Sequence, residues 1–492
     1  MVFSLAPLSR TITLTKYFLR SLLFAFFCLS ASSASLAQSS ELPEFGESYA
    51  TTIGQEYFLG RAWLMSFRRQ APTMADPLIQ TYVEDLIYRL AATSELKDRR
   101  LELILVDQRS INAFAVPGGV VGVNTGLMDK AESEAQFASV LTHELAHVSQ
   151  RHFARGIEAQ KKASTAMMAG LLAGVLLAVT EGGAEGMAAM AAGSAAGMQS
   201  KLRYSRLHEQ EADRIGMKNM VRAQMNPQGA EEMFKIMQAE SRGYARPPEF
   251  LLTHPLTDRR ISDARNRSRE YPRQVYPENL EYQLMRSRVA LSYIKDDEEA
   301  IAQFRDKLAK GGRNAEPHQY GLVLALIRGG QYKEAKELLA PLREFSPSNM
   351  TYGLAEAELL VASGQHDKAL ELLNRGMALV PGNYAISMAL ADAYIEWGEH
   401  PKAAEVLEVL ATERPRDPNV WFLLAESQGK AGNILRVHQA RAEYFVLNGA
   451  TGQALQQLKF ALAINSNPPL TNTRISERIK QVQQIQVAMG RF

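Results

Sequence analysis

His143-Glu144-Leu145-Ala146-His147 is the segment that decides how this chain folds around its chemistry. Apolar residues recur on one side of the stretch from Glu132 to about Phe153, which predicts an amphipathic helix with this segment in its middle. Two histidines four residues apart lie on one face of a helix, so both imidazoles can reach one metal ion. Glu144 then lies where it can take a proton from a water molecule that the ion activates. The segment therefore predicts a zinc-dependent hydrolytic site.

The third metal ligand must come from outside this helix. The metzincin pattern requires a glycine and a histidine where Gln150 and Phe153 stand, so that class is excluded. His152 is one residue short of the required spacing and is predicted to face away from the metal. A second charged helix offers Glu209 and Asp213, which are four apart and share a face. Glu209 can bind zinc while Asp213 hydrogen-bonds the far nitrogen of a ligand histidine, although a solvated surface helix would have the same composition.

The first 37 residues resemble a secretory signal. Basic residues without any acid precede the apolar run Leu22 to Leu29, which is too short to span a bilayer, and small residues follow. Cys28, the single cysteine of the chain, lies in this segment. We expect a mature chain that begins near Gln38 and binds metal through histidines and carboxylates only. The formal net charge of +2 gives no support to nucleic-acid binding.

Strands are expected ahead of the motif helix. The run Leu101 to Val106 reads as one strand, and residues 112–124 read as two more strands joined by a Pro-Gly-Gly turn. A strand at a sheet edge can pair with an extended substrate chain and present it to the metal. The same strands could equally just complete the sheet. The residues predicted to form the substrate-binding strand are Phe114, Val116, Gly118 and Gly119.

Residues 165–198 are rich in Met, Ala and Gly. Their apolar core is about 13 residues long and is followed by Glu181 and Glu185, so a membrane span is not expected. The simpler interpretation is a buried helix with a Gly-rich loop. The alternative is a lid or hydrophobic hairpin that meets substrate or a membrane surface.

The C-terminal half repeats itself with a period of 34 residues, which is the period of tetratricopeptide helix pairs. We expect the small residues to allow close packing at helix turns, and each proline to follow the end of a second helix. A hinge is expected near residues 270–282. The recurring positions are Gly330, Gly364, Gly398 and Gly432, then Ala335, Ala369 and Ala403, and Pro347, Pro381 and Pro415.

The motifs together resemble one metallopeptidase family. His143-Glu144-x-x-His147, a later Glu209-x-x-x-Asp213, and Asn-Ala-Phe-Ala-x-Pro-Gly-Gly upstream are similar to the gluzincins that include the CAAX prenyl proteases and the membrane protease HtpX. With the signal segment and the repeats, the whole mature chain resembles the periplasmic β-barrel assembly-enhancing proteases. The resemblance implies that His143, His147 and Glu209 bind one Zn²⁺ per chain. It implies that Glu144 is the general base. It also implies that Asp213 belongs to the catalytic site and hydrogen-bonds a ligand histidine without binding the metal itself.

The resemblance also gives His254 a role. The family has a His-Pro segment after the second helix, matched here by His254-Pro255 with Arg260 six residues on. In the assembly-enhancing proteases this histidine can occupy the fourth zinc position and hold the enzyme latent. Without the family, a histidine before a proline is more often a surface loop residue.

We therefore expect a mainly α protein. A signal peptide at 1–37 would precede an α+β zincin-like metallopeptidase domain with a small sheet at 38–275, and then an α-solenoid of tetratricopeptide repeats at 276–492. The resemblance implies a periplasmic zinc endopeptidase, peripheral at the outer membrane, that degrades misfolded or stalled outer-membrane proteins. Its repeats would assist assembly by docking on the outer-membrane β-barrel assembly machinery. The alternatives are a scaffold or chaperone with a latent or structural zinc site, and a protease anchored in a membrane by residues 165–198.

Overall fold

The computed structural model describes residues 52–158, 206–243, 249–312, 315–464 and 468–489. The predicted signal segment at 1–37 and the Met-, Ala- and Gly-rich stretch at 165–198 lie outside these ranges, so both expectations stay predictions. Within the described ranges, no helix combines the length and the apolar character needed to cross a membrane.

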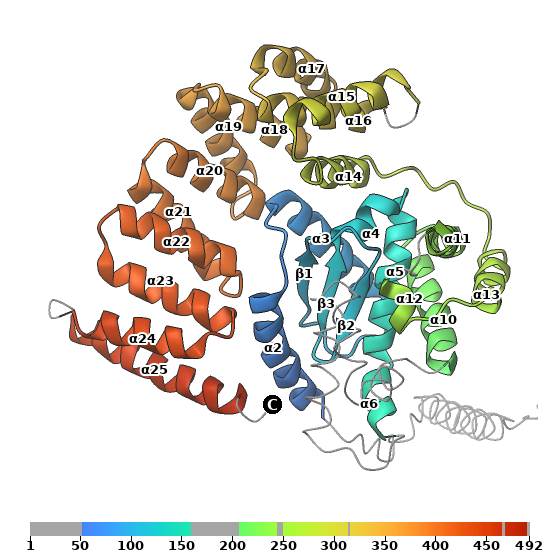
Figure 1. Cartoon of the computed structure of the whole chain (residues 1–492), viewed down its shortest axis with the longest axis horizontal. Helices are drawn as coiled ribbons and strands as arrows, with labels where there is room; N and C mark the ends of the chain where they lie inside the picture. The colour runs from blue at the N-terminus through green and yellow to red at the C-terminus, as the bar shows by residue number, and fades with distance from the viewer. Residues whose placement is uncertain (1–51, 159–205, 244–248, 313–314, 465–467, 490–492) are drawn as a thin grey trace, which may run out of the picture. The chain divides into compact units, whose positions relative to one another are not determined.

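A three-stranded sheet and the helices around it form the first part of the described chain (Figure 1). Its elements are α2 (Ile53–Gln70), α3 (Pro77–Thr93), β1 (Glu102–Val106), β2 (Ala113–Val116), β3 (Val120–Asn124), α4 (Thr125–Lys130), α5 (Glu134–Ser149), α6 (His152–Glu158), α10 (Arg206–Arg222), α11 (Gln228–Gly243), α12 (Glu249–Thr253) and α13 (Asp258–Ser268). The strand order is β1-β3-β2, with β1 parallel and β2 antiparallel to β3. The predicted small sheet is confirmed, and its two edges are β1 and β2.

Both faces of the sheet are buried, because successive side chains of a strand point to opposite faces. On one face, Phe114 packs against Trp63 and Phe67 of α2, with ring centroids 5.6 Å from each of them. On the other face, Leu103 and Leu105 join the larger core that includes α3 and α5. The sheet is thereby held between α2 and the helix that carries the metal-binding motif.

The Pro-Gly-Gly turn between β2 and β3 rests directly on α2. Gly118 and Gly119 have φ of 84° and 78°, in the left-handed region that glycine adopts without strain. A Cβ on Gly118 would stand 2.5 Å from the backbone oxygen of Glu56. The turn therefore requires both glycines, and at Gly118 the contact with α2 requires one as well. The predicted approach of a substrate chain stays a prediction.

The motif helix ends earlier than its periodicity predicts. Ser133 caps the N-terminus of α5 by accepting from the Gln136 N–H at 3.3 Å. At the other end Arg151 has a positive φ of 51°, which interrupts the expected helix to Phe153 and starts α6 at His152. This left-handed residue changes the direction of the chain, so His152 does not follow the rotation of α5.

The remaining elements are helices that stack in antiparallel pairs (Figure 1). They are α14 (Leu280–Ser292), α15 (Asp297–Ala309), α16 (Ala315–Arg328), α17 (Tyr332–Phe345), α18 (Met350–Ala362), α19 (His366–Leu379), α20 (Tyr384–Glu396), α21 (His400–Glu413), α22 (Pro418–Lys430), α23 (Ile434–Leu447), α24 (Thr451–Leu462) and α25 (Pro469–Met489). The predicted helical solenoid is confirmed.

The repeated glycines have a different physical reason from the one that we predicted. Each follows the first helix of a pair with φ between 72° and 81°, and a Cβ there would meet nothing within 4 Å. Left-handed backbone at the helix end, not close packing, therefore selects glycine. Close packing falls on the repeated alanines, which are all fully buried. These positions are Gly330, Gly364, Gly398 and Gly432 for the turns, and Ala335, Ala369 and Ala403 for the packing.

The chain between α13 and α14 has no helix or strand over residues 271–279, which is where we expected the hinge. The solenoid nevertheless begins inside the core of the first part. Tyr282 of α14 is fully buried and its hydroxyl donates to the Ala131 carbonyl at 2.8 Å. The domain boundary at 275 stays a prediction.

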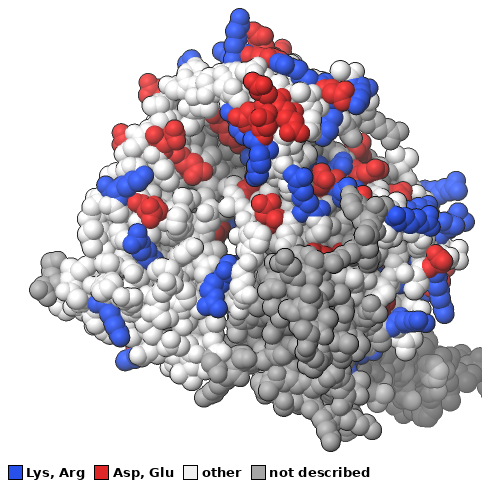
Figure 2. Space-filling model, in the orientation of Figure 1, with Lys and Arg blue, Asp and Glu red and all other residues white. Residues whose placement is uncertain are grey.

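Basic and acidic side chains are interspersed over the described surface on the face drawn in Figure 2. This mixture agrees with the small formal net charge of +2. This face therefore adds no support for a nucleic-acid partner.

Candidate metal centre

Two helices and one loop bring four potential metal ligands together. His143 and His147 come from α5 and Glu209 from α10, while His254 directly follows α12. One ligand atom from each lies within 4.8 Å of those of the other three. All four residues are at most 5% exposed. The fold has placed side chains up to 111 positions apart in sequence around one point.

The distances within this cluster suit a tetrahedral ion. His143 Nε2 lies 3.0 Å from His147 Nε2 and 3.4 Å from His254 Nδ1. Glu209 oxygens lie 3.5 Å from both α5 histidine Nε2 atoms and 3.1 Å from His254 Nδ1. Tetrahedral zinc with bonds of about 2.1 Å separates its ligand atoms by about 3.4 Å. Three imidazoles and one carboxylate therefore fit a divalent metal, and these residues could hold it.

Glu144 follows His143 in α5 and is fully buried. Its Oε1 is 3.5 Å from His254 Nε2, and the Ala115 backbone in β2 also interacts with this carboxyl. Burial raises the pKa of Glu144. A buried carboxyl with a raised pKa is suited to take up and return a proton. This geometry is compatible with the predicted general base.

Asp213 and Arg260 contact the candidate ligands His143 and Glu209 on the sides that face away from the metal position. Asp213 Oδ1 is 3.0 Å from Nδ1 of His143, the nitrogen that faces away from the other ligands. Arg260 donates to both Asp213 oxygens at 2.7 Å and lies 2.9 Å from Glu209 Oε2. Burial would raise the pKa of Asp213, but Arg260 and His143 hold it below its usual value. Sequence reasoning noted Arg260 only by its spacing, and missed that it orients a ligand.

These contacts also set the proton affinity of His143. Burial by itself would lower the pKa of His143, but hydrogen bonds to Asp213 and Glu209 raise it to about 9. The same burial, together with the neighbouring His143, lowers the pKa of His147. The two α5 ligands are therefore electrostatically different although they occupy equivalent positions in the motif.

His254 is not a surface residue. It is 2% exposed, its N–H donates to the Phe250 carbonyl at 2.8 Å, and its ring stacks on the Phe250 ring at 4.6 Å. Its Nδ1 is directed at the ligands and its Nε2 at Glu144. The simpler interpretation of a histidine in an exposed loop is therefore wrong for this chain. The position is compatible with a fourth ligand, and the latch role stays a prediction.

His152 makes a contact near the metal cluster that its position in the sequence did not predict. Because Arg151 breaks the helix, His152 folds back until its Nδ1 is 2.9 Å from Nδ1 of His147. Its Nε2 is 3.2 Å from Glu211, which also accepts from Arg155 at 3.0 Å. His152 therefore supports a candidate ligand through that ligand's outer nitrogen. Helical periodicity could not predict this contact, because the contact depends on the left-handed backbone of Arg151.

The predicted substrate-binding strand is an edge strand beside α5, but its side chains are not available. Phe114 is 7% exposed and Val116 is 1% exposed, and both pack toward α2. Gly118 and Gly119 serve the turn. Only the backbone edge of β2 remains for pairing with a substrate chain, and that role stays a prediction.

Comparison with known proteins assigns the family. Residues 77–268 match the model of peptidase family M48, and residues 360–426 match a tetratricopeptide repeat model. The putative β-barrel assembly-enhancing protease of Vibrio cholerae is 34% identical over 446 residues, covering 90% of this chain and 92% of that protein. The chain belongs to the β-barrel assembly-enhancing protease family. The member from Escherichia coli K12 is 31% identical, again with 90% of this chain and 92% of that protein covered.

Membership makes the chain a metalloendopeptidase with a repeat domain. A more distant relative, the mitochondrial metalloendopeptidase OMA1 of Schizosaccharomyces pombe, is 30% identical over 180 residues, which is 37% of this chain and 50% of that protein. A metal is thus expected from the family, and the buried cluster around His143 and Glu209 is where the described residues can bind one.

Proposed function

We propose that this chain is a zinc endopeptidase of the periplasm that degrades misfolded or stalled outer-membrane proteins and also assists their assembly. The observation that carries the proteolytic part is the buried cluster of His143, His147, Glu209 and His254 with Glu144 beside it. The names of the relatives support a role in β-barrel assembly, and the predicted signal segment supports export. The repeats would provide the surface that docks on the outer-membrane assembly machinery.

The protein groups divide the proposed chemistry between them. When bound, zinc polarises a peptide carbonyl and lowers the pKa of its water toward about 7. Glu144 then takes the proton from the attacking water and passes it to the leaving amine, for which its raised pKa is favourable. Asp213 fixes the ring of His143, and Arg260 fixes both Asp213 and Glu209. The edge of β2 would hold the substrate chain extended beside α5.

The substitution Glu144→Gln tests this assignment. It keeps the shape of the side chain and removes the proton acceptor, so cleavage of an unfolded outer-membrane protein should fall by at least a thousandfold. Zinc content per chain, measured by mass spectrometry of the purified protein, should stay near that of the parent. Cleavage by the variant at the parental rate would show that the assigned mechanism is wrong.

We further propose that His254 closes the site in the resting enzyme. Its 2% exposure and its position 3.1 Å from Glu209 support a fourth ligand that a substrate or partner must displace. The substitution His254→Ala should then raise proteolysis while zinc remains bound. Loss of zinc on this substitution would contradict a displaceable latch.

The closed four-residue arrangement also favours a second candidate, a scaffold or chaperone whose metal is structural. The same His254→Ala variant separates the two, since continued absence of proteolysis with zinc bound favours the scaffold. Fractionation tests the location: release from cells by osmotic shock, and from membranes by alkaline carbonate, is expected of a peripheral periplasmic protein. Retention after carbonate would favour the anchored protease instead.

A further inference from the structure

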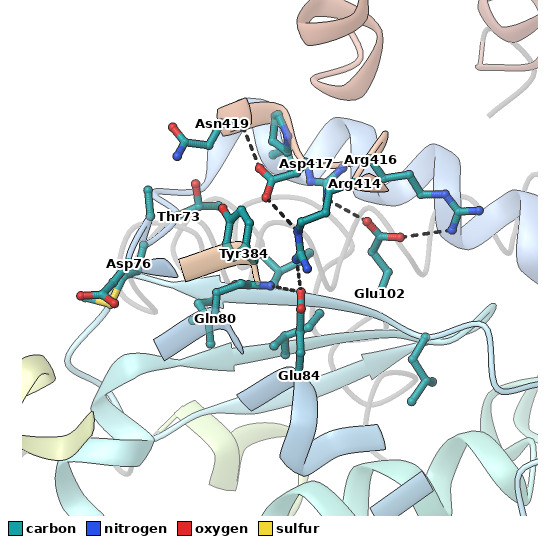
Figure 3. Close-up of a pocket in the computed structure, with 18 of the residues that line it drawn as sticks. Thr73, Asp76, Gln80, Glu84, Glu102, Tyr384, Arg414, Arg416, Asp417 and Asn419 are labelled. Carbon is teal, nitrogen blue, oxygen red and sulfur yellow. Dashed lines mark hydrogen bonds and ion pairs between the residues drawn. The ribbon is translucent and has the colours of Figure 1, made fainter. Parts of the chain in front are cut away.

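A cavity of about 440 Å³ lies along the edge of the sheet that faces the repeats, opposite to the β2 edge (Figure 3). One side of the cavity is formed by β1 and α3. The opposite side is formed by Tyr384 and the turn between α21 and α22. Arg414 of that turn reaches across the cavity to Glu84 of α3 at 2.7 Å, and Arg416 lies 3.4 Å from Glu102 of β1. The two parts of the chain therefore hold this cavity between them without filling it.

The β1 edge inside the cavity carries unused backbone groups. Successive residues of a strand direct their amide groups to opposite edges, and the Glu102 N–H bonds toward β3 at 2.9 Å. Leu103 and Leu105 therefore direct theirs into the cavity. The Leu105 carbonyl accepts from the Met74 N–H at 3.0 Å. Across the described ranges no hydrogen bond is found to the Leu103 N–H, the Leu103 carbonyl or the Leu105 N–H.

These groups are available to an added strand. Leu103 and Leu105 line the cavity, and the unpaired N–H and C=O groups of a strand edge are a template for pairing with another chain. The loop at Thr73 already begins an antiparallel partner through its bridge to Val106, but the chain then turns away into α3 at Pro77. The positions beside Leu103 and Leu105 that a longer partner strand would occupy are therefore open.

The shape and chemistry of this edge suit one kind of occupant. Only an extended polypeptide offers alternating N–H and C=O groups at the spacing of a strand. The cavity is lined by five carboxylates and three guanidiniums, and each of the three guanidiniums lies against one of these carboxylates. Glu413 at its mouth is exposed and has no cationic partner among the described residues. A basic side chain on the guest strand would find a counter-charge there.

We propose that the β1 edge is a second polypeptide-binding site, distinct from the metal centre, which takes an extended segment with basic side chains by strand addition. It goes beyond the proposed proteolysis because it needs neither metal nor Glu144. A chain could be held at β1 while another part of it is presented at β2, on the opposite edge of the same sheet.

Binding is tested on the full-length, zinc-loaded Glu144→Gln protein with a fluorescein-labelled decapeptide of alternating lysine and valine. Fluorescence anisotropy should show saturable binding, at least tenfold weaker for the alternating glutamate and valine peptide. The lysine peptide methylated at every backbone nitrogen should also bind at least tenfold weaker, because it cannot donate to the Leu103 carbonyl. Equal affinities of the methylated and unmethylated peptides would overturn the proposal.

Hydrogen exchange identifies the edge that is used. Peptide should slow exchange at Leu103 and Leu105, whose amides face the cavity, and leave Ile104 unchanged because it already pairs with β3. Protection confined to β2 would contradict the proposal. The substitution Ala75→Trp places bulk in the cavity and should weaken peptide binding at least tenfold, whereas Trp at the exposed Ala302 on α15 should not. Unchanged affinity in the folded Ala75→Trp protein would also overturn it.

Discussion

His152 contacts a candidate metal ligand without being one of the four candidate ligands itself. It contacts the outer nitrogen of His147 at 2.9 Å and is itself held by Glu211. Partners of this kind typically change metal affinity by about 10- to 100-fold when they are removed. We predict that His152→Ala weakens zinc binding by about that factor, as measured by competition with a chelating dye.

The control for this prediction is His318→Ala, which removes a partly buried histidine from α16, away from the site. It should leave zinc affinity unchanged. If His152→Ala bound zinc as tightly as the parent, the contact with His147 would be only a packing contact.

Helical spacing predicted the candidate ligands and the support from Asp213, but not the contact that Arg260 makes. The four-residue spacing of His143 and His147 follows from helix geometry alone, and so does the shared face of Glu209 and Asp213. The ion pair between Arg260 and Glu209 depends on how α13 packs on α10, which no local pattern contains.

At the scale of helices, the turn glycines allow a direct test of backbone conformation. Gly398 has φ of 75° with open space around it, so an added Cβ costs backbone strain and nothing else. We predict that Gly398→Ala destabilises the protein by about 1 kcal/mol. The matched change Gly452→Ala, inside α24 and also in open space, should stabilise it by up to about 0.5 kcal/mol.

Urea unfolding followed by circular dichroism measures both changes on the same full-length chain. Opposite signs are expected, since both substitutions add the same methyl group without a packing contact. Equal signs would show that packing, as we first predicted for these glycines, decides the residue after all.

At the scale of the whole molecule, neighbouring carboxyl groups on two repeat helices make stability depend on pH. Asp392 of α20 is exposed on its outer side, but partial desolvation of its carboxyl and the nearby Glu358 of α18 raise the pKa of Asp392 to about 6. A raised carboxyl pKa favours the folded state at low pH, and this contribution is lost as pH rises through about 6. We predict that Asp392→Asn raises the melting temperature relative to the parent more at pH 8 than at pH 5.

The control is Asp367→Asn at an exposed position in the first turn of α19. Its effect on the melting temperature, measured by scanning calorimetry, should be the same at both pH values. A pH-independent effect of Asp392→Asn would contradict the stated pKa.

The sequence by itself determined the features that repeat at short range. The metal motif, the paired residues of the second helix and the 34-residue period all follow from helical geometry, so they predicted a metallopeptidase joined to a solenoid. Tertiary structure decided what depends on long-range packing. It placed His254 in the core, turned His152 toward His147, and left the β1 edge open beside Arg414. These outcomes depend on contacts between segments up to hundreds of residues apart, which periodicity does not encode.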